Sequence, residues 1–243
     1  MTVEADSYYV GGYWGPRAEP VDDCARRLAH FLSMLHGLHP LLASWYKTGG
    51  SRREAMAHRV DPSAETLQEL LLAGQNRRDD EARTIIHDLG FSVDLWNGRE
   101  PQAGLMAHCG SSAALSGPTS NHVVVDLPEP EGEGLALYDR DTALGLMRAV
   151  VTAWRPSWCT WANRPLRKAQ ARVRGEVVVG WSTYVADADG VRIDTLPAGV
   201  TAQRLEGGLL LTFDGDAVSA SEPSVSDLRG ALGSAVRLKS ADC

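Results

Sequence analysis

The chain has 243 residues and a formal net charge of −7, with ordinary hydrophobic and charged fractions of 44% and 23%. A general binder of the nucleic-acid backbone needs a basic face, so this balance argues against that class and suits a protein that docks on a basic partner. The length allows one large domain, and we expect a single domain over residues 1–243.

No run of about 18 apolar residues indicates a membrane helix, and the N-terminal residues do not form the apolar core of a signal peptide. The four cysteines are Cys24, Cys109, Cys159 and Cys243. They lack zinc-like spacing to one another or to histidine. We therefore expect a cytoplasmic protein with reduced thiols, no metal and no cofactor.

The N-terminal third predicts one strand followed by helices. Residues 7–14 are aromatic and glycine-rich and indicate a strand closed by Gly-Pro. Apolar residues at three- and four-residue spacing predict a helix that ends near Leu38, with Asp22 or Asp23 as its cap. A short helix is expected over residues 41–46. Another follows over residues 64–72 and is stopped by a glycine.

The middle of the chain predicts a hairpin, a third strand and a helix. Residues 91–96 and 104–109 indicate paired strands because Asn-Gly follows the first of them. Residues 121–127 indicate the next strand, and the acidic, Pro/Gly-rich residues 128–134 an exposed loop. Asp141 or Thr142 is expected to cap a helix that runs to Trp154.

The C-terminal part predicts a meander followed by a helix. Residues 157–164 show no clear period. Residues 176–186, E-V-V-V-G-W-S-T-Y-V-A, indicate a central strand because both of its faces are uncharged. Residues 200–205 and 209–213 complete the meander, and a last helix begins at Glu222. This order predicts an α+β fold, with a mixed or antiparallel sheet and helices packed on it.

Two histidine patterns could indicate a metal site or a catalytic site. His36 and His39 lie three apart on a helix, within reach of one ion, but no third ligand is near in sequence. His108 and Cys109 are adjacent, and neighbours on a strand point to opposite faces, so His108 is not placed to activate the thiol. A small cytosolic hydrolase built around His108 and Cys109 remains an alternative function.

A basic stretch could indicate nucleic-acid binding, and an acidic stretch could indicate calcium binding. Residues 164–174 carry five basic residues and no acid, which leaves a nucleic-acid-binding module as a further alternative. Asp187-Ala188-Asp189-Gly190 begins like a calcium loop, but Ala198 stands where a bidentate glutamate is required. A β-turn accounts for those residues.

Three acidic clusters are either solvated loops or a docking surface for a cationic cleft. They share exposed, turn-forming surroundings, and their members are Asp79, Asp80 and Glu81, then Glu129, Glu131 and Glu133, and finally Asp187 with Asp189.

Three stretches together resemble the bacterial immunity protein 52 family. They are Y-Y-V-G-G-Y-W-G-P-R at residues 8–17, A-W-R-P-S-W at residues 153–158, and V-G-W-S-T-Y-V at residues 179–185. The likeness covers about residues 8–236, whereas residues 159–161 depart from the family pattern. Structural roles are expected for Trp14, Trp154, Gly180, Trp181 and Tyr184.

The resemblance implies a non-enzymatic antidote of a polymorphic toxin system. The toxin of such a system is secreted by a contact-dependent or type VI pathway. Such proteins bind a toxin whose C-terminal domain resembles a restriction endonuclease, and they carry no catalytic residues. Our leading hypothesis is therefore a toxin-neutralising immunity protein, with the three acidic clusters as its toxin-facing surface.

Overall fold

The computed structural model describes residues 7–113, 120–170 and 176–236. The strands are β1 Tyr8–Trp14, β2 Tyr46–Lys47, β3 Phe91–Trp96, β4 Gly104–Cys109, β5 Asn121–Asp126, β6 Trp158–Asn163, β7 Ser182–Val185, β8 Val200–Leu205 and β9 Gly208–Phe213. The α-helices are α1 Val21–Leu38, α2 Arg52–Met56, α3 Ala64–Ala73, α4 Arg140–Trp154, α5 Arg164–Ala169 and α6 Glu222–Leu232. Short 3₁₀ helices are η1 Pro40–Leu42, η2 His87–Leu89, η3 Gly132–Tyr138, η4 Ile193–Thr195 and η5 Gly233–Val236.

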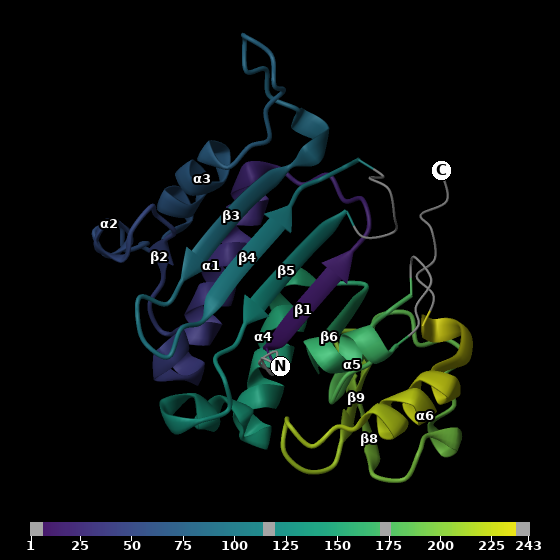
Figure 1. Ribbon diagram of the computed structural model, residues 1–243. Coiled ribbons are helices and arrows are strands. Elements are labelled where there is room, and N and C mark those ends of the chain that lie inside the picture. The colour runs from purple at the N-terminus through teal and green to yellow at the C-terminus, as the bar shows by residue number, and fades with distance from the viewer. Residues whose placement is uncertain (1–6, 114–119, 171–175, 237–243) are drawn as a thin grey trace.

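All nine strands belong to one sheet with the order β2-β3-β4-β5-β1-β6-β7-β9-β8. Each neighbouring pair is antiparallel. The expected α+β fold, with an antiparallel sheet and a C-terminal meander followed by a helix, is confirmed (Figure 1).

Helices α1 and α4 pack on one face of the sheet, and α3 packs on α1 (Figure 1). Gly12 in β1 allows this close approach, because a Cβ there would stand 2.6 Å from Val150 of α4. On the opposite face, the described helices α5 and α6 cover the half of the sheet that holds β6, β7 and β9 (Figure 1). The two halves of the sheet therefore differ in how many of their faces are covered.

Burial along the strands follows this difference in cover. Every residue of β6, β7 and β9 is buried. In β4 and β5 buried residues alternate with more exposed ones, because alternate side chains point away from α1 and α4. Met106 in β4 is 41% exposed on this uncovered side.

The strand predicted over residues 176–186 is shorter than expected. Ladder pairing begins only at Ser182, although residues 177–181 are buried. Their backbone groups are satisfied in other ways: Val179 exchanges hydrogen bonds of 2.9 and 2.7 Å with the Gln170 side chain, and Gly180 donates to Thr183 Oγ1. β7 is interior as predicted, but β1 is the middle strand of the sheet.

Residues 157–164, which showed no period, contain the interior strand β6. A strand that is buried on both faces has no alternation to detect. The prediction of a helix over residues 41–46 is wrong, because Pro40–Leu42 forms a 3₁₀ turn and Tyr46 belongs to β2.

Both helix caps, predicted at Asp22 or Asp23 and at Asp141 or Thr142, were misplaced by two or three residues. The first helix is preceded by Pro20 and the second by Asp139, neither with a side-chain cap, so Asp22, Asp23 and Asp141 lie inside the first turns. Acidic side chains there still favour the positive end of the helix dipole.

Candidate functional site

Residues 75–86 form an arm that projects beyond the end of β3 (Figure 1). Its stalk is held by a bridge between Arg77 and Ile85 and by a hydrogen bond of 2.8 Å from Arg78 N to Thr84 O. At the tip, Asp80 Oδ1 accepts from Thr84 N at 3.2 Å, and residues 77–84 are all exposed. The arm is thus a hydrogen-bonded hairpin that presents Asp79, Asp80 and Glu81 to solvent.

The other two acidic clusters lie away from this tip. Glu129 to Glu133 follow the end of β5 that is remote from the arm, and Glu133 forms an ion pair of 3.7 Å with Arg99. Asp187 and Asp189 follow β7 in the other half of the sheet, where Asp189 N donates to Asp187 Oδ1 at 3.3 Å. The structure does not bring the three clusters together into one surface.

The expected loop over residues 128–134 is only partly exposed. Glu131, Gly132 and Glu133 are exposed, whereas Pro128 and Gly134 are buried and η3 begins within the stretch.

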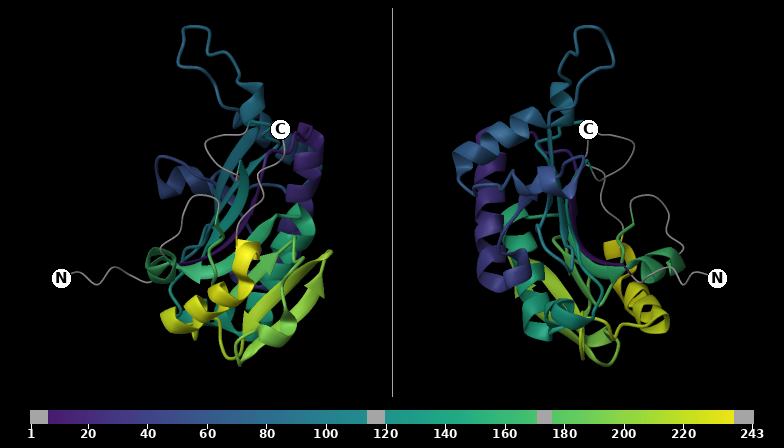
Figure 2. Two further views of the ribbon diagram at one scale, coloured as in Figure 1. Left: turned by 90° about the vertical axis from the view of Figure 1, so that its right-hand side faces the viewer. Right: turned by 60° about the vertical axis from the view of Figure 1, so that its left-hand side comes forward.

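Among the described residues, no helix covers the face of β3, β4 and β5 that points away from α1 and α4 (Figures 1 and 2). We call it the open face and define it by Tyr13, Ser92, Asp94, Met106, His108, His122, Val124 and Asp126. The register makes Ser92, His108, His122 and Tyr13 successive partners across the strands.

Four rings form a continuous row across this face and into β6, and we call them the ring row: His108, His122, Tyr13 and Trp158. The ring centroids of His108 and His122 are 5.6 Å apart, and those of Tyr13 and Trp158 are stacked at 4.2 Å. His122 and Tyr13 connect these pairs at 6.3 Å. Ser92 Oγ lies 2.8 Å from His108 Nδ1 at the β3 end of the row.

Burial keeps the imidazoles of His108 and His122 neutral near pH 7. Burial, reinforced by the nearby His108, lowers the pKa of His122 to about 4, and burial also lowers the pKa of His108. Burial raises the pKa of Asp126, and Arg164 opposes that rise.

The three stretches that resemble one family meet at the middle of the sheet. Residues 8–17 include β1, residues 153–158 link α4 to β6, and residues 179–185 include β7. Trp14 stacks on Trp154 at 5.7 Å, and Trp161 meets Trp181 edge to face at 5.9 Å. The tryptophans Trp14, Trp154 and Trp181 and the tyrosine Tyr184 are at most 2% exposed.

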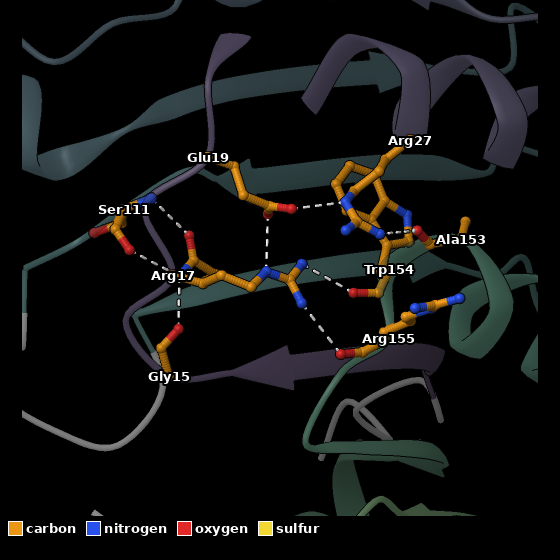
Figure 3. A network of polar contacts seen from close by, with 9 residues as sticks. Gly15, Arg17, Glu19, Arg27, Ser111, Ala153, Trp154 and Arg155 are labelled. Atoms are coloured by element: carbon orange, nitrogen blue, oxygen red, sulfur yellow. Dashed lines mark hydrogen bonds and ion pairs between the residues drawn. The ribbon is translucent and has the colours of Figure 1, made fainter. Parts of the chain in front are cut away.

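Arg17 and Arg27 join the first two stretches through Glu19 (Figure 3). Glu19 accepts from Arg17 Nε at 2.9 Å and from Arg27 Nε at 2.8 Å. The two guanidinium groups also donate to the carbonyls of Ala153 and Trp154, at 3.0 and 2.9 Å. These carbonyls belong to the last turn of α4, so the cluster satisfies helix-end acceptors that lack intrahelical partners.

The pair required by the hydrolase alternative is not formed. Cys109 is fully buried, and its thiol contacts the Cys24 thiol, which together with burial raises the pKa of Cys109 well above its usual value. His108 lies on the opposite face of β4 and contacts Ser92. The geometry therefore gives no support to a Cys109–His108 nucleophile.

The remaining candidate sites also have ordinary structural partners. His36 Nδ1 lies 3.0 Å from Ala43 O, and His39 Nδ1 accepts from Leu41 N at the start of η1. Arg164 and Arg167 lie on α5, whereas residues 171–175 of the basic stretch fall outside the described residues. Within the described ranges, no three His, Cys, Asp or Glu side chains gather as a metal site requires.

Sequence reasoning missed the ring row. For the two histidines the signal was present in the strand parity, because His108 and His122 alternate with buried residues in β4 and β5, whereas β1 shows no alternation around Tyr13. Their alignment depended on the order and register of strands, which the sequence did not show. In the described part of the chain, no helix is both long and apolar enough to cross a bilayer.

Comparison with known structures shows a shared fold. The Pseudomonas aeruginosa T6SS protein PA0821 superposes with a TM-score of 0.53 at 11% identity, covering 95% of this chain and 76% of that chain. A search among curated proteins found no match. Residues 6–239 match the family described as immunity protein 52. Because the match spans nearly the whole sequence, the chain belongs to the immunity protein 52 family.

Proposed function

We propose that this protein is a cytoplasmic, non-catalytic immunity protein that binds and neutralises a nuclease toxin with a restriction-endonuclease-like domain. Membership of the immunity protein 52 family carries the proposal, since an immunity protein acts through a cognate toxin. The T6SS protein of similar fold supports delivery of that toxin by a type VI or other contact-dependent pathway.

The tip of the arm is the acidic cluster best placed to contact the toxin. A nuclease that holds DNA presents basic groups around its reaction site, and an acidic group entering that site would replace phosphate charge. Asp79 and Glu81 stand on an ordered projection in which residues 77–84 are exposed. The tip can therefore enter a concave site that a flat surface could not reach.

The other two clusters are proposed as secondary contacts with weaker geometric support. Glu129, Glu131 and Glu133 lie at the opposite end of β5 from the arm, and Asp187 and Asp189 lie in the other half of the sheet. One toxin domain is not expected to cover all three clusters at once.

The test is co-purification with a catalytically inactive copy of the toxin encoded beside the gene, followed by inhibition of the active nuclease. We expect a complex that weakens as salt is raised, because exposed charge pairs are screened. A purified protein that neither binds nor inhibits this toxin would refute the proposed function.

A pair of charge reversals tests the role of the arm. The double variant Asp79→Lys/Glu81→Lys is expected to weaken the complex by at least about tenfold, since like charges at an interface cost several kcal/mol. Asp80 is left unchanged because it holds Thr84 N. The matched control reverses Glu222 and Asp227, which are exposed on α6 and should not alter binding.

A further inference from the structure

The open face is a sheet surface that leaves both charged and ring side chains accessible. Asp94 and Asp126 are exposed, Met106 is 41% exposed, and His108 and His122 are partly exposed. Asp94 forms no ion pair with any described residue. A sheet surface that combines an unpaired carboxylate with an exposed thioether and partly exposed rings offers several kinds of contact to a partner.

We propose that the open face is a second toxin-contact surface and that it takes a basic segment of the toxin, with an arginine or lysine side chain lying beside Asp94 and over the ring row. The proposal rests on the proposed function and adds to it the surface and the chemistry of the partner segment.

The charges of the open face favour a basic occupant. Its two exposed acidic side chains are Asp94 and Asp126, and its histidines are neutral near pH 7, so the strands β3 to β5 contribute negative charge there. A guanidinium group can pair with a carboxylate while it stacks on neighbouring rings. An acidic or nucleic-acid partner would be repelled, and a purely apolar one would leave Asp94 desolvated and unpaired.

The open face is continuous with the arm. Ser92 N donates to Gly74 O at 3.3 Å, and Gln75 pairs with Phe91, so the root of the arm is next to the β3 end of the ring row. Figure 2 shows the arm leaning toward the side of the sheet that faces away from α1. One toxin domain could therefore contact the arm tip and the open face together.

Helix α5 sets the other border of this surface and has the opposite charge. Arg164 lies near enough to Asp126 to favour its charged form, and Arg167 likewise acts on Tyr13. The negative part of the surface is thus the part nearest the arm, over β3 and β4. We expect the basic segment of the toxin to lie there rather than beside α5.

Opposite charges introduced at the same position test this proposal. Met106 lies between Asp94 and Val124 in the register, and its exposure allows either charge without burial. Affinity for the catalytically inactive toxin is measured for wild type, Met106→Lys and Met106→Glu. We expect Met106→Lys to weaken binding by at least about tenfold and Met106→Glu to bind as tightly as wild type or tighter.

The controls separate the surface from its surroundings. Ile193, which is 56% exposed between β7 and β8, is replaced by Lys and by Glu, and neither change should alter binding. Thermal unfolding and size-exclusion chromatography establish that each variant folds and whether it self-associates.

The outcomes distinguish the two proposals. Wild-type protein that does not bind the toxin overturns the proposed function, and this inference with it. If wild type binds and the two Met106 variants bind equally well or equally poorly, the basic-segment proposal is wrong while the immunity function stands. Wild-type self-association that Met106→Lys abolishes would assign the open face to a second copy of the chain and also overturn it.

Discussion

The described helices cover both faces of the half of the sheet formed by β6, β7 and β9, but only one face of the half formed by β3, β4 and β5 (Figure 1). In the first half every strand residue is buried, and Trp161 and Trp181 pack edge to face. In the second half, alternate positions remain open to solvent. The first half is thus a fixed scaffold, and the second supplies a surface that a partner can reach.

A matched pair of glycine substitutions gives the largest contrast between the halves. A Cβ on Gly180 would stand 1.9 Å from Trp161 O, whereas a Cβ on Gly104 would meet nothing closer than 3.7 Å. Gly180→Ala should cost at least about 3 kcal/mol in unfolding free energy because backbone must move. Gly104→Ala should change it by less than about 1 kcal/mol. Urea unfolding measures both, and similar losses would contradict the contrast.

The junction of the two halves depends on Glu19. Glu19→Gln leaves Arg17 and Arg27 partly buried without their carboxylate, so we expect a loss of about 2–3 kcal/mol, below the range for fully buried pairs. Asp23→Asn breaks the exposed pair with Arg26 and should cost less than about 1 kcal/mol. Equal losses in thermal or urea unfolding would show that the Glu19 cluster is not structural.

The protein should lose stability at acidic pH because His122 in the ring row is buried in its neutral form. The pKa of His122 is about 4 when folded and near 6.5 when unfolded, so its contribution to stability is complete above about pH 6.5 and is lost as the pH falls toward 4. Between pH 7 and pH 4 the free energy of unfolding of wild type should therefore fall by about 2 kcal/mol more than that of His122→Gln.

The comparison between wild type and variant isolates His122 from its neighbours. Tyr13 and His108 face it from the adjoining strands, and Met106 Sδ lies 3.4 Å from its Nε2. Burial raises the pKa of Asp126, which acts in the opposite direction and is present in both proteins. His30→Gln, exposed on α1, is the control, and a wild-type pH profile unchanged by His122→Gln would contradict the assignment.

The smallest effect is expected at the centre of the open face. Met106→Lys and Met106→Glu should each change the unfolding free energy by less than about 0.5 kcal/mol, because the side chain is 41% exposed. Leu210→Ala, on the doubly covered β9, should cost about 2–5 kcal/mol by the same urea unfolding. A large loss at Met106 would mean that the open face is packed against the chain itself.

Local pattern was sufficient where one face of an element meets solvent. The spacing of Leu28, Leu32 and Leu35 predicted α1, and the strands β3, β4 and β5 were found near their observed bounds. Each of these elements has a buried and a more exposed side, which imposes a period on its residues. The motifs in β1, before β6 and around β7 also indicated the family that the whole sequence matches.

Tertiary structure decided what depends on contacts between distant segments. Trp158–Asn163 became a strand because β1 and β7 flank it and both of its faces are covered, so no period marked it. Residues 177–181 left the ladder because Gly180 passes against Trp161 and Gln170 satisfies Val179.

The candidate surfaces divide in the same way. The acidic residues of the arm could be read from the sequence, since Asp79, Asp80 and Glu81 are adjacent in it. The ring row could not, because His108, His122 and Tyr13 come from three strands and meet only through the register β4-β5-β1. Sequence alone determines which residues alternate, whereas the order and register of the strands determine which of them become neighbours.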